Sequence, residues 1–330
     1  MTVGESARGM GLRHLAPEHR LRWLELTITR RLDGLLHGEY LGLLPGPGSE
    51  PAGSREYRPG EDEVRRMDWA VTARTTTPHV RETDADRELT TWALVDATPS
   101  MDFGTAELEK RELAVAALAA IGFLTARVGN RLGVHTLAAD RVWRWPARGG
   151  RGHLWALLRT LLASPRATPE TSAGPSLADA IDALRRGASQ RGLAVVISDF
   201  LDGLPDSLDA EPEWEKPLRR LAVRHQVLAV EVIDPRELEL PDIGVVTLVD
   251  PESGRRREVS TADRRLRARF AAAAAAQRAA VAGALRRAGA TRLSLRTDQD
   301  WVTEIVRHVH VQRRLANAAP PAFSRKGAWT

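Results

Sequence analysis

The chain has 330 residues and a formal charge of +5, and 43% of its residues are hydrophobic. This length and apolar content allow a large buried core, with room for one small additional unit. The sequence contains no cysteine, which excludes disulfides, thiol nucleophiles and cysteine-ligated zinc.

The small excess of basic over acidic residues in the chain does not indicate nucleic-acid binding. It has 48 basic residues against 43 acidic ones, and the arginines are scattered among the acids. The densest basic cluster, Arg255–Arg257, has no adjacent aromatic residue on which a base could stack. We therefore expect a solvated charged surface and no nucleic-acid partner.

No stretch of the sequence indicates a membrane span or a signal peptide. The N-terminal residues lack the apolar core of a secretory signal, and the longest apolar run, residues 113–126, is too short to cross a bilayer. We expect a buried helix there and a cytoplasmic protein.

The front of the chain predicts a helix followed by a small appendage. Residues 17–36 place leucines and isoleucine on one helical stripe, and a Gly/Pro-rich loop follows. A turn at Pro59-Gly60 then precedes a short helix and the strand "HVRE". We assign residues 1–87 to this part, which has too few apolar residues for its own core, and expect Trp69 to pack on the sheet of the main domain.

From residue 88 onward, strands alternate with amphipathic helices. The predicted strands are "TTWALV", "RLGVHTL", "LAVVIS", "QVLAVEVI" and "TRLSLRT". The predicted helices between them cover residues 107–127, 152–162, 177–188 and 214–224. This alternation predicts an α/β, Rossmann-like domain over residues 88–316, with a mostly parallel sheet and helices on both faces.

Three further features interrupt or end this pattern. "RVWRWPA" predicts an edge hairpin on the second strand, and residues 242–260 predict a β-hairpin excursion around "PESG". A long alanine-rich helix follows, with Ser260 and Asp263 as a predicted capping box and Gly289 at its end. Residues 317–330 are predicted to form a disordered tail.

Acidic residues follow three of the predicted strands. Asp96 ends the first and is followed by Thr98 and Ser100, and Asp199 follows the third. Because parallel strands end at one edge of a sheet, these oxygens converge, and a set without His or Cys suits Mg²⁺ or Mn²⁺. The alternative is a helix cap and turn without a metal. Asp234, which precedes a proline, is read as a turn former.

The stretch "DATPS" at residues 96–100 resembles the D-x-[ST]-x-S signature of the von Willebrand factor A fold, its metal-ion-dependent adhesion site. The resemblance implies that Thr98 and Ser100 touch the metal, that Asp96 acts through water, and that Asp199 is the third-loop ligand. The family commonly has Gly-Gly-Thr in the second loop, whereas this chain has "TSAGPS". The Thr position is then Pro175 or Ser176, and only Ser176 supplies a hydroxyl.

The stretch "YRPGEDEVRRMDWAVTART", together with "ISDF" and "DPRELELPDIGVVTLVDPESG", is similar to the bacterial family catalogued as domain of unknown function 58. That resemblance implies a von Willebrand factor A-like domain that works with a MoxR-type AAA+ ATPase as a non-enzymatic adaptor. The implied adaptor presents its metal to an acidic group of the partner.

The alternative function is a metal-assisted hydrolase that uses the same strand-end carboxylates. Such hydrolysis usually needs a positioned base or a second metal. Neither His135, inside a strand, nor His225, at a helix end, is placed for that role.

Overall fold

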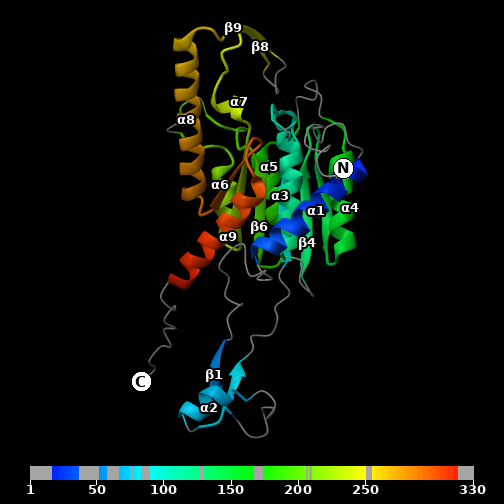
Figure 1. Ribbon diagram of the computed structural model, residues 1–330, viewed down its shortest axis with the longest axis vertical. Coiled ribbons are helices and arrows are strands. Elements are labelled where there is room, and N and C mark those ends of the chain that lie inside the picture. The colour runs from blue at the N-terminus through cyan, green and yellow to red at the C-terminus, as the bar shows by residue number, and fades with distance from the viewer. Residues whose placement is uncertain are drawn as a thin grey trace, which may run out of the picture.

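A computed structural model shows the architecture of the protein (Figure 1). The structure describes residues 17–36, 52–57, 67–75, 77–82, 90–106, 108–125, 130–166, 174–205, 207, 210–249 and 255–318. The predicted turn at Pro59-Gly60, the loop at residues 37–51 and the predicted tail beyond Ala318 lie outside these residues.

A six-stranded sheet forms the centre of the fold, in the order β10-β7-β6-β3-β4-β5. The strands are β3 (Thr90–Asp96), β4 (Arg131–Leu137), β5 (Val142–Arg148), β6 (Leu193–Ser198), β7 (Gln226–Ile233) and β10 (Thr291–Arg296). Neighbours pair in parallel except β5, which runs antiparallel to β4 at one edge. The predicted mostly parallel α/β sheet is confirmed.

Helices cover both faces of this sheet, as its buried strands require. One face packs against α1 (Pro17–Leu36), α3 (Lys110–Thr125), α4 (Arg151–Ala163) and α9 (Trp301–Ala318). The other packs against α5 (Leu177–Gly187), α6 (Glu215–Ala222) and α8 (Arg264–Arg287). Along β3, Ala93 and Val95 enter the first layer and Leu94 the second, which follows the two-residue period of a strand.

Helix α1 belongs to the core of the sheet domain. Leu24 and Ile28, both on the predicted apolar stripe, are buried with the first helical layer. The side chain of Arg31 also pairs with Asp300 at the start of α9. The N-terminal helix is therefore joined to the sheet by packing and by charge.

The appendage is a two-stranded unit, β1 (Ala52–Glu56) and β2 (His79–Glu82), with α2 (Trp69–Thr75). In Figure 1 it lies apart from the sheet. The Trp69 side chain is 66% exposed, so the prediction that it packs on the sheet is wrong. One tryptophan in a sequence does not by itself show whether its side chain is buried or exposed.

The predicted hairpin is formed by β8 (Val245–Val249) and β9 (Arg256–Ser260), beyond one end of α8 (Figure 1). The capping-box prediction for α8 is wrong in part. Ser260 ends β9, and Asp263 alone caps the helix by accepting from the amide of Arg265. Gly289 follows α8 with φ 77°, as a terminating glycine requires. No helix in the described part of the chain is both long and apolar enough to cross a membrane.

Candidate functional site

The order of the strands locates a candidate site between β3 and β6. Counted along the chain within this sheet, the strand order reverses at this pair, and doubly wound sheets bind ligands at that point, beyond the carboxyl ends of the strands. Val95 pairs with Ile197 in the parallel register, so Asp96 lies level with Ser198 and next to the loop that begins at Asp199. The predicted convergence of Asp96 and Asp199 on one sheet edge is confirmed.

Asp96 is buried and is held by hydroxyl and amide donors. Its Oδ1 accepts from the Thr98 amide at 3.0 Å and from the Thr98 hydroxyl at 2.7 Å. Its Oδ2 accepts from the hydroxyl of Ser198 at 2.6 Å. All these donors are neutral, and among the residues that the structure describes no Lys, Arg or His side chain forms an ion pair with the Asp96 carboxylate.

Ser100 lies close to both carboxylates. It lies in the 3₁₀ turn η4 (Pro99–Met101), and its Oγ is 3.3 Å from the Oγ1 of Thr98. Its hydroxyl also helps to lower the pKa of Asp199. Hydrogen bonds therefore join Asp96, Thr98 and Ser100, and Ser100 lies close enough to Asp199 to affect the pKa of that carboxyl.

Asp199, unlike Asp96, is paired with a cation. The Lys110 Nζ lies 2.8 Å from Asp199 Oδ2 and 2.5 Å from Oε1 of Glu237, which lies on the short helix α7 (Pro235–Leu238). The Lys110 side chain is 0% exposed. The other Asp199 oxygen accepts from the amide of Leu201 at 3.1 Å.

An arginine holds the backbone of Asp199, and the residue that follows Asp199 has a strained conformation. The guanidinium of Arg278, on α8, donates to the Asp199 carbonyl at 3.0 Å and also pairs with Glu231 and Glu237. The next residue, Phe200, is buried with φ 58°, a left-handed conformation that is unfavourable for a bulky side chain. Strain of this kind persists only where the surroundings fix it, and it often accompanies function.

These surroundings shift the two pKa values in opposite directions. Burial, and then the negative charge of Asp199, raise the pKa of Asp96 to about 6. Burial would also raise the pKa of Asp199, but the Lys110 ammonium holds it below its usual value. Of these two carboxylates, Asp96 is therefore the one whose negative charge is less compensated by its surroundings.

The fifth predicted residue, Ser176, serves as a helix cap. Its hydroxyl accepts from the amide of Asp179 at 3.1 Å and contacts the Asp179 carboxylate at 2.9 Å, at the start of α5. The adjacent amide of Leu177 donates to Asp202, three residues after Asp199, so this loop is tied to the Asp199 loop. Among the described residues, the Ser176 hydroxyl bonds within its own helix cap and forms no hydrogen bond to Asp96.

Asp234 also acts as a cap, as expected for a turn former. It begins α7, where its Oδ1 accepts from the amide of Arg236 at 2.9 Å. Thr105 and Thr297 donate their hydroxyls to the same carboxylate. Its oxygens are therefore committed to holding the fold.

The site residues fit a small hard cation by chemistry. Thr98 and Ser198 donate their protons to Asp96, which leaves lone pairs on the hydroxyl oxygens, and Mg²⁺ prefers neutral and anionic oxygen ligands. Within the described residues, no group of three or more His, Asp or Glu side chains is arranged to hold a metal. A metal here would thus rely on the hydroxyls of Thr98 and Ser100 together with Asp96 and Asp199.

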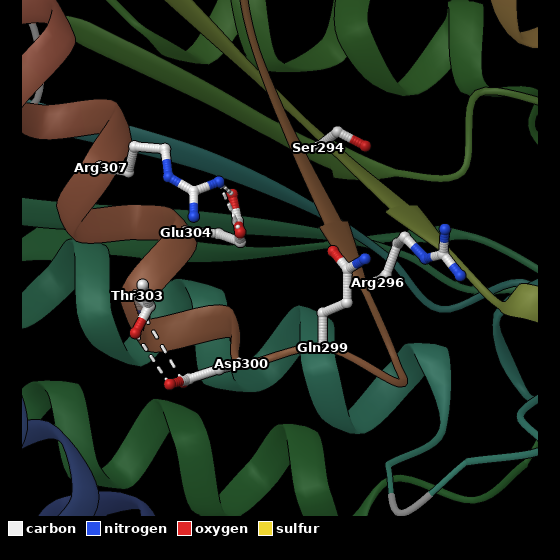
Figure 2. A pocket seen from close by; sticks show the side chains of 7 residues that line it. All are labelled: Ser294, Arg296, Gln299, Asp300, Thr303, Glu304 and Arg307. Atoms are coloured by element: carbon white, nitrogen blue, oxygen red, sulfur yellow. Dashed lines mark hydrogen bonds and ion pairs between the residues drawn. The ribbon is translucent and has the colours of Figure 1, made fainter.

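A cavity of about 560 Å³ lies elsewhere, between the outer edge of β10 and the start of α9 (Figure 2). Its charges are paired with one another or with neighbours: Arg307 with Glu304, and Arg296 with Asp298. Figure 2 also shows Thr303 turned toward Asp300, with which it hydrogen-bonds at 2.8 Å. Because these charged groups are already paired, the cavity is a weaker candidate for ligand binding than the strand-end site.

The sequence analysis did not assign roles to Lys110, Ser198, Phe200 or Arg278. Lys110 had a usable signal, because it is one of only three lysines in an arginine-rich chain and begins a helix that is apolar from Leu113 onward. Phe200 and Arg278 had none, since a positive φ and a contact between distant residues leave no trace in a single sequence.

The fold and the site define an α/β domain of the doubly wound kind, with an acid- and hydroxyl-lined site at its switch point. The family described as "Protein of unknown function DUF58" matches residues 53–280, and the chain belongs to this family. Among its relatives, uncharacterised proteins of Mycobacterium bovis (Mb1516) and Mycobacterium tuberculosis (Rv1480) are each 57% identical over 298 residues, which is 90% of this chain and 90% of theirs.

Solved structures show more distant similarity. The protein BatB from Bacteroides thetaiotaomicron is 13% identical with a TM-score of 0.41, over 68% of this chain and 99% of that one. An aerotolerance-related membrane protein from Bacteroides fragilis is also 13% identical, with a TM-score of 0.43, over 69% of this chain and 99% of that one. The VWA domain of SpRpn10 has a TM-score of 0.34 and 13% identity, over 66% and 94% of the two chains.

Proposed function

We propose that the protein is a non-enzymatic interaction protein that presents a divalent metal ion, Mg²⁺ or Mn²⁺, to an acidic group of a partner. The metal would be held by Asp96, Thr98, Ser100 and Asp199. The bound ion would supply a positive charge at the sheet edge, and the partner's carboxylate would complete its set of oxygen ligands.

The observation that carries this proposal is the clustering of Asp96, Thr98, Ser100 and Asp199. The cluster brings two carboxylates and two hydroxyls to the switch point of the sheet, where folds of this kind bind their ligands. The raised pKa of Asp96, caused by burial and by Asp199, adds support, because a cation relieves such crowding of negative charge.

The metal-assisted hydrolase is the less favoured function. A hydrolytic base needs a free acceptor within reach of water. Both Asp96 oxygens accept hydrogen bonds, and Asp199 accepts from Lys110 and from the Leu201 amide. His135 lies within β4, and its pKa is lowered to about 4 by burial and by the charge of Arg144. In the part of the chain that the structure describes, it forms no hydrogen bond or ion pair with these carboxylates.

The proposed partner is a MoxR-type AAA+ ATPase, which the family resemblance implies. Its test is a binding measurement between the full-length chain and the MoxR-type ATPase of the same organism, with Mg²⁺ or with EDTA. We expect binding in Mg²⁺ that is lost in EDTA and in Asp96→Ala.

The matched control is Asp298→Ala, which removes an exposed acid at the same sheet edge without touching the site. It should bind as the wild type does. Binding that survives both EDTA and Asp96→Ala would refute metal presentation, and an ATPase that never binds would refute the partner.

A further inference from the structure

Lys110 combines complete burial with direct contact to a proposed metal ligand. Its side chain is 0% exposed, whereas the side chain of Lys216 is 67% exposed. Its ammonium contacts the carboxylates of Asp199 and Glu237. Burying an ammonium is costly unless its charge is paired, and these two acids supply that pairing.

The position of Lys110 does not serve the stability of its own helix. It is the first residue of α3, where the helix dipole disfavours a positive charge. The following residues of α3 are mostly apolar and buried, so an apolar side chain would suit this position in the core. The lysine is therefore better explained by the acids it faces.

Asp199 is shared between this ammonium and the proposed metal set. Lys110 contacts Asp199 Oδ2, and the Ser100 hydroxyl lies close enough to the same carboxylate to lower its pKa. A divalent ion that used Asp199 would have to share it with a fixed positive charge, and like charges at such short range repel strongly in a buried site. No ion pair to Asp96 occurs among the described residues, so the two acids of the set are compensated unequally.

We propose that Lys110 is the resident counter-ion of this site, and that it weakens metal binding by occupying Asp199. This inference rests on the proposed metal site and specifies how that site is regulated. The built-in charge keeps the free protein weakly loaded, and the acidic group of a partner offsets the repulsion. Metal binding and partner binding therefore strengthen each other.

The test is Mn²⁺ binding, measured by calorimetry at fixed pH on the full-length wild type and on Lys110→Gln, which removes the charge but keeps a hydrogen-bond donor. We expect roughly tenfold or tighter binding in Lys110→Gln, because one close positive charge is gone. Adding Asp96→Ala to Lys110→Gln should abolish that binding.

The matched control is Arg287→Gln, which removes a cation from another buried acid, Glu215, that contributes nothing to the site. It should bind Mn²⁺ as the wild type does. Equal affinity of wild type and Lys110→Gln would overturn the role of Lys110 and leave the metal site standing. Absence of binding in both would overturn the metal site and this inference together.

A second measurement uses the unmodified chain, in case Lys110→Gln does not fold. With only three lysines, Lys110, Lys216 and Lys326, ammonium nitrogen resonances can be assigned by substitution of the two others. Saturating Mg²⁺ should shift the Lys110 resonance and leave the others in place. A Lys110 resonance that does not move while Mg²⁺ saturates the site would overturn the proposal.

Discussion

Asp96 and Asp234 occupy similar places in the fold, but their pKa values are shifted in opposite directions. Each lies at the carboxyl end of a central strand, is buried, and accepts hydrogen bonds from threonine hydroxyls and backbone amides. The pKa of Asp96 is raised to about 6, whereas the pKa of Asp234 is lowered.

The difference comes from their neighbours. Burial acts to raise both pKa values, but at Asp234 the hydrogen bonds from Thr105, Arg236 and Thr297 outweigh it. At Asp96 the charge of Asp199 adds to burial and outweighs fewer hydrogen bonds. A strand-end aspartate thus becomes a structural cap or a candidate ligand according to the charge beside it.

The largest expected effect follows from removing the cation of the site. Lys110→Met leaves Asp199 and Glu237 without their buried counter-ion and should lower the free energy of unfolding by about 3–5 kcal/mol. Adding Asp199→Asn should recover much of that loss. Urea unfolding of the wild type and the two variants measures this, and a Lys110→Met protein as stable as the wild type would show that the buried pair is not needed.

The next effect compares the two aspartates directly. Asp234→Ala leaves several buried donors without an acceptor and should cost about 3 kcal/mol of unfolding free energy. Asp96→Asn keeps an acceptor for Thr98 and removes the repulsion by Asp199, so its stability at pH 7 should equal or exceed that of the wild type. Equal losses in the two variants would show that Asp96 and Asp234 contribute to the fold in the same way.

A smaller effect is the pH dependence of the unfolding free energy that comes from Asp96. The folded-state pKa of Asp96 is about 6 and its reference value is 3.8, so the native state binds this proton more tightly. Its contribution to stability is present below about pH 4 and is lost as the pH rises through 6. The stability of the wild type minus that of Asp96→Asn should therefore fall from pH 4 to pH 6 and then level off. A difference that stays flat would mean that the pKa of Asp96 is not raised.

The smallest effect concerns Ser176. Ser176→Ala removes the N-cap of α5 and should cost about 1 kcal/mol. Because the hydroxyl is used by Asp179, we expect Mn²⁺ affinity to be unchanged. An affinity loss comparable to that of Thr98→Ala would make Ser176 a ligand after all.

Sequence patterns were sufficient for the sheet, because each parallel strand is a short apolar run and each strand–helix alternation is local. They were also sufficient to bring Asp96 and Asp199 together, since parallel strands end at one edge. They could not show that Lys110 reaches Asp199, because that contact spans 89 positions and depends on how α3 docks. Nor could they show that the Ser176 hydroxyl caps a helix.

The measurement that tests the central claim most directly is the stability of the full-length protein against Mg²⁺ concentration, in the wild type and in Asp96→Ala. If the strand-end set binds the ion in the folded state only, the wild-type free energy of unfolding must rise with Mg²⁺, by about 2.7 kcal/mol at a hundredfold excess over Kd. Asp96→Ala should show no such rise, and Asp298→Ala should behave as the wild type. A wild-type unfolding curve that does not move up to millimolar Mg²⁺ would contradict the metal site.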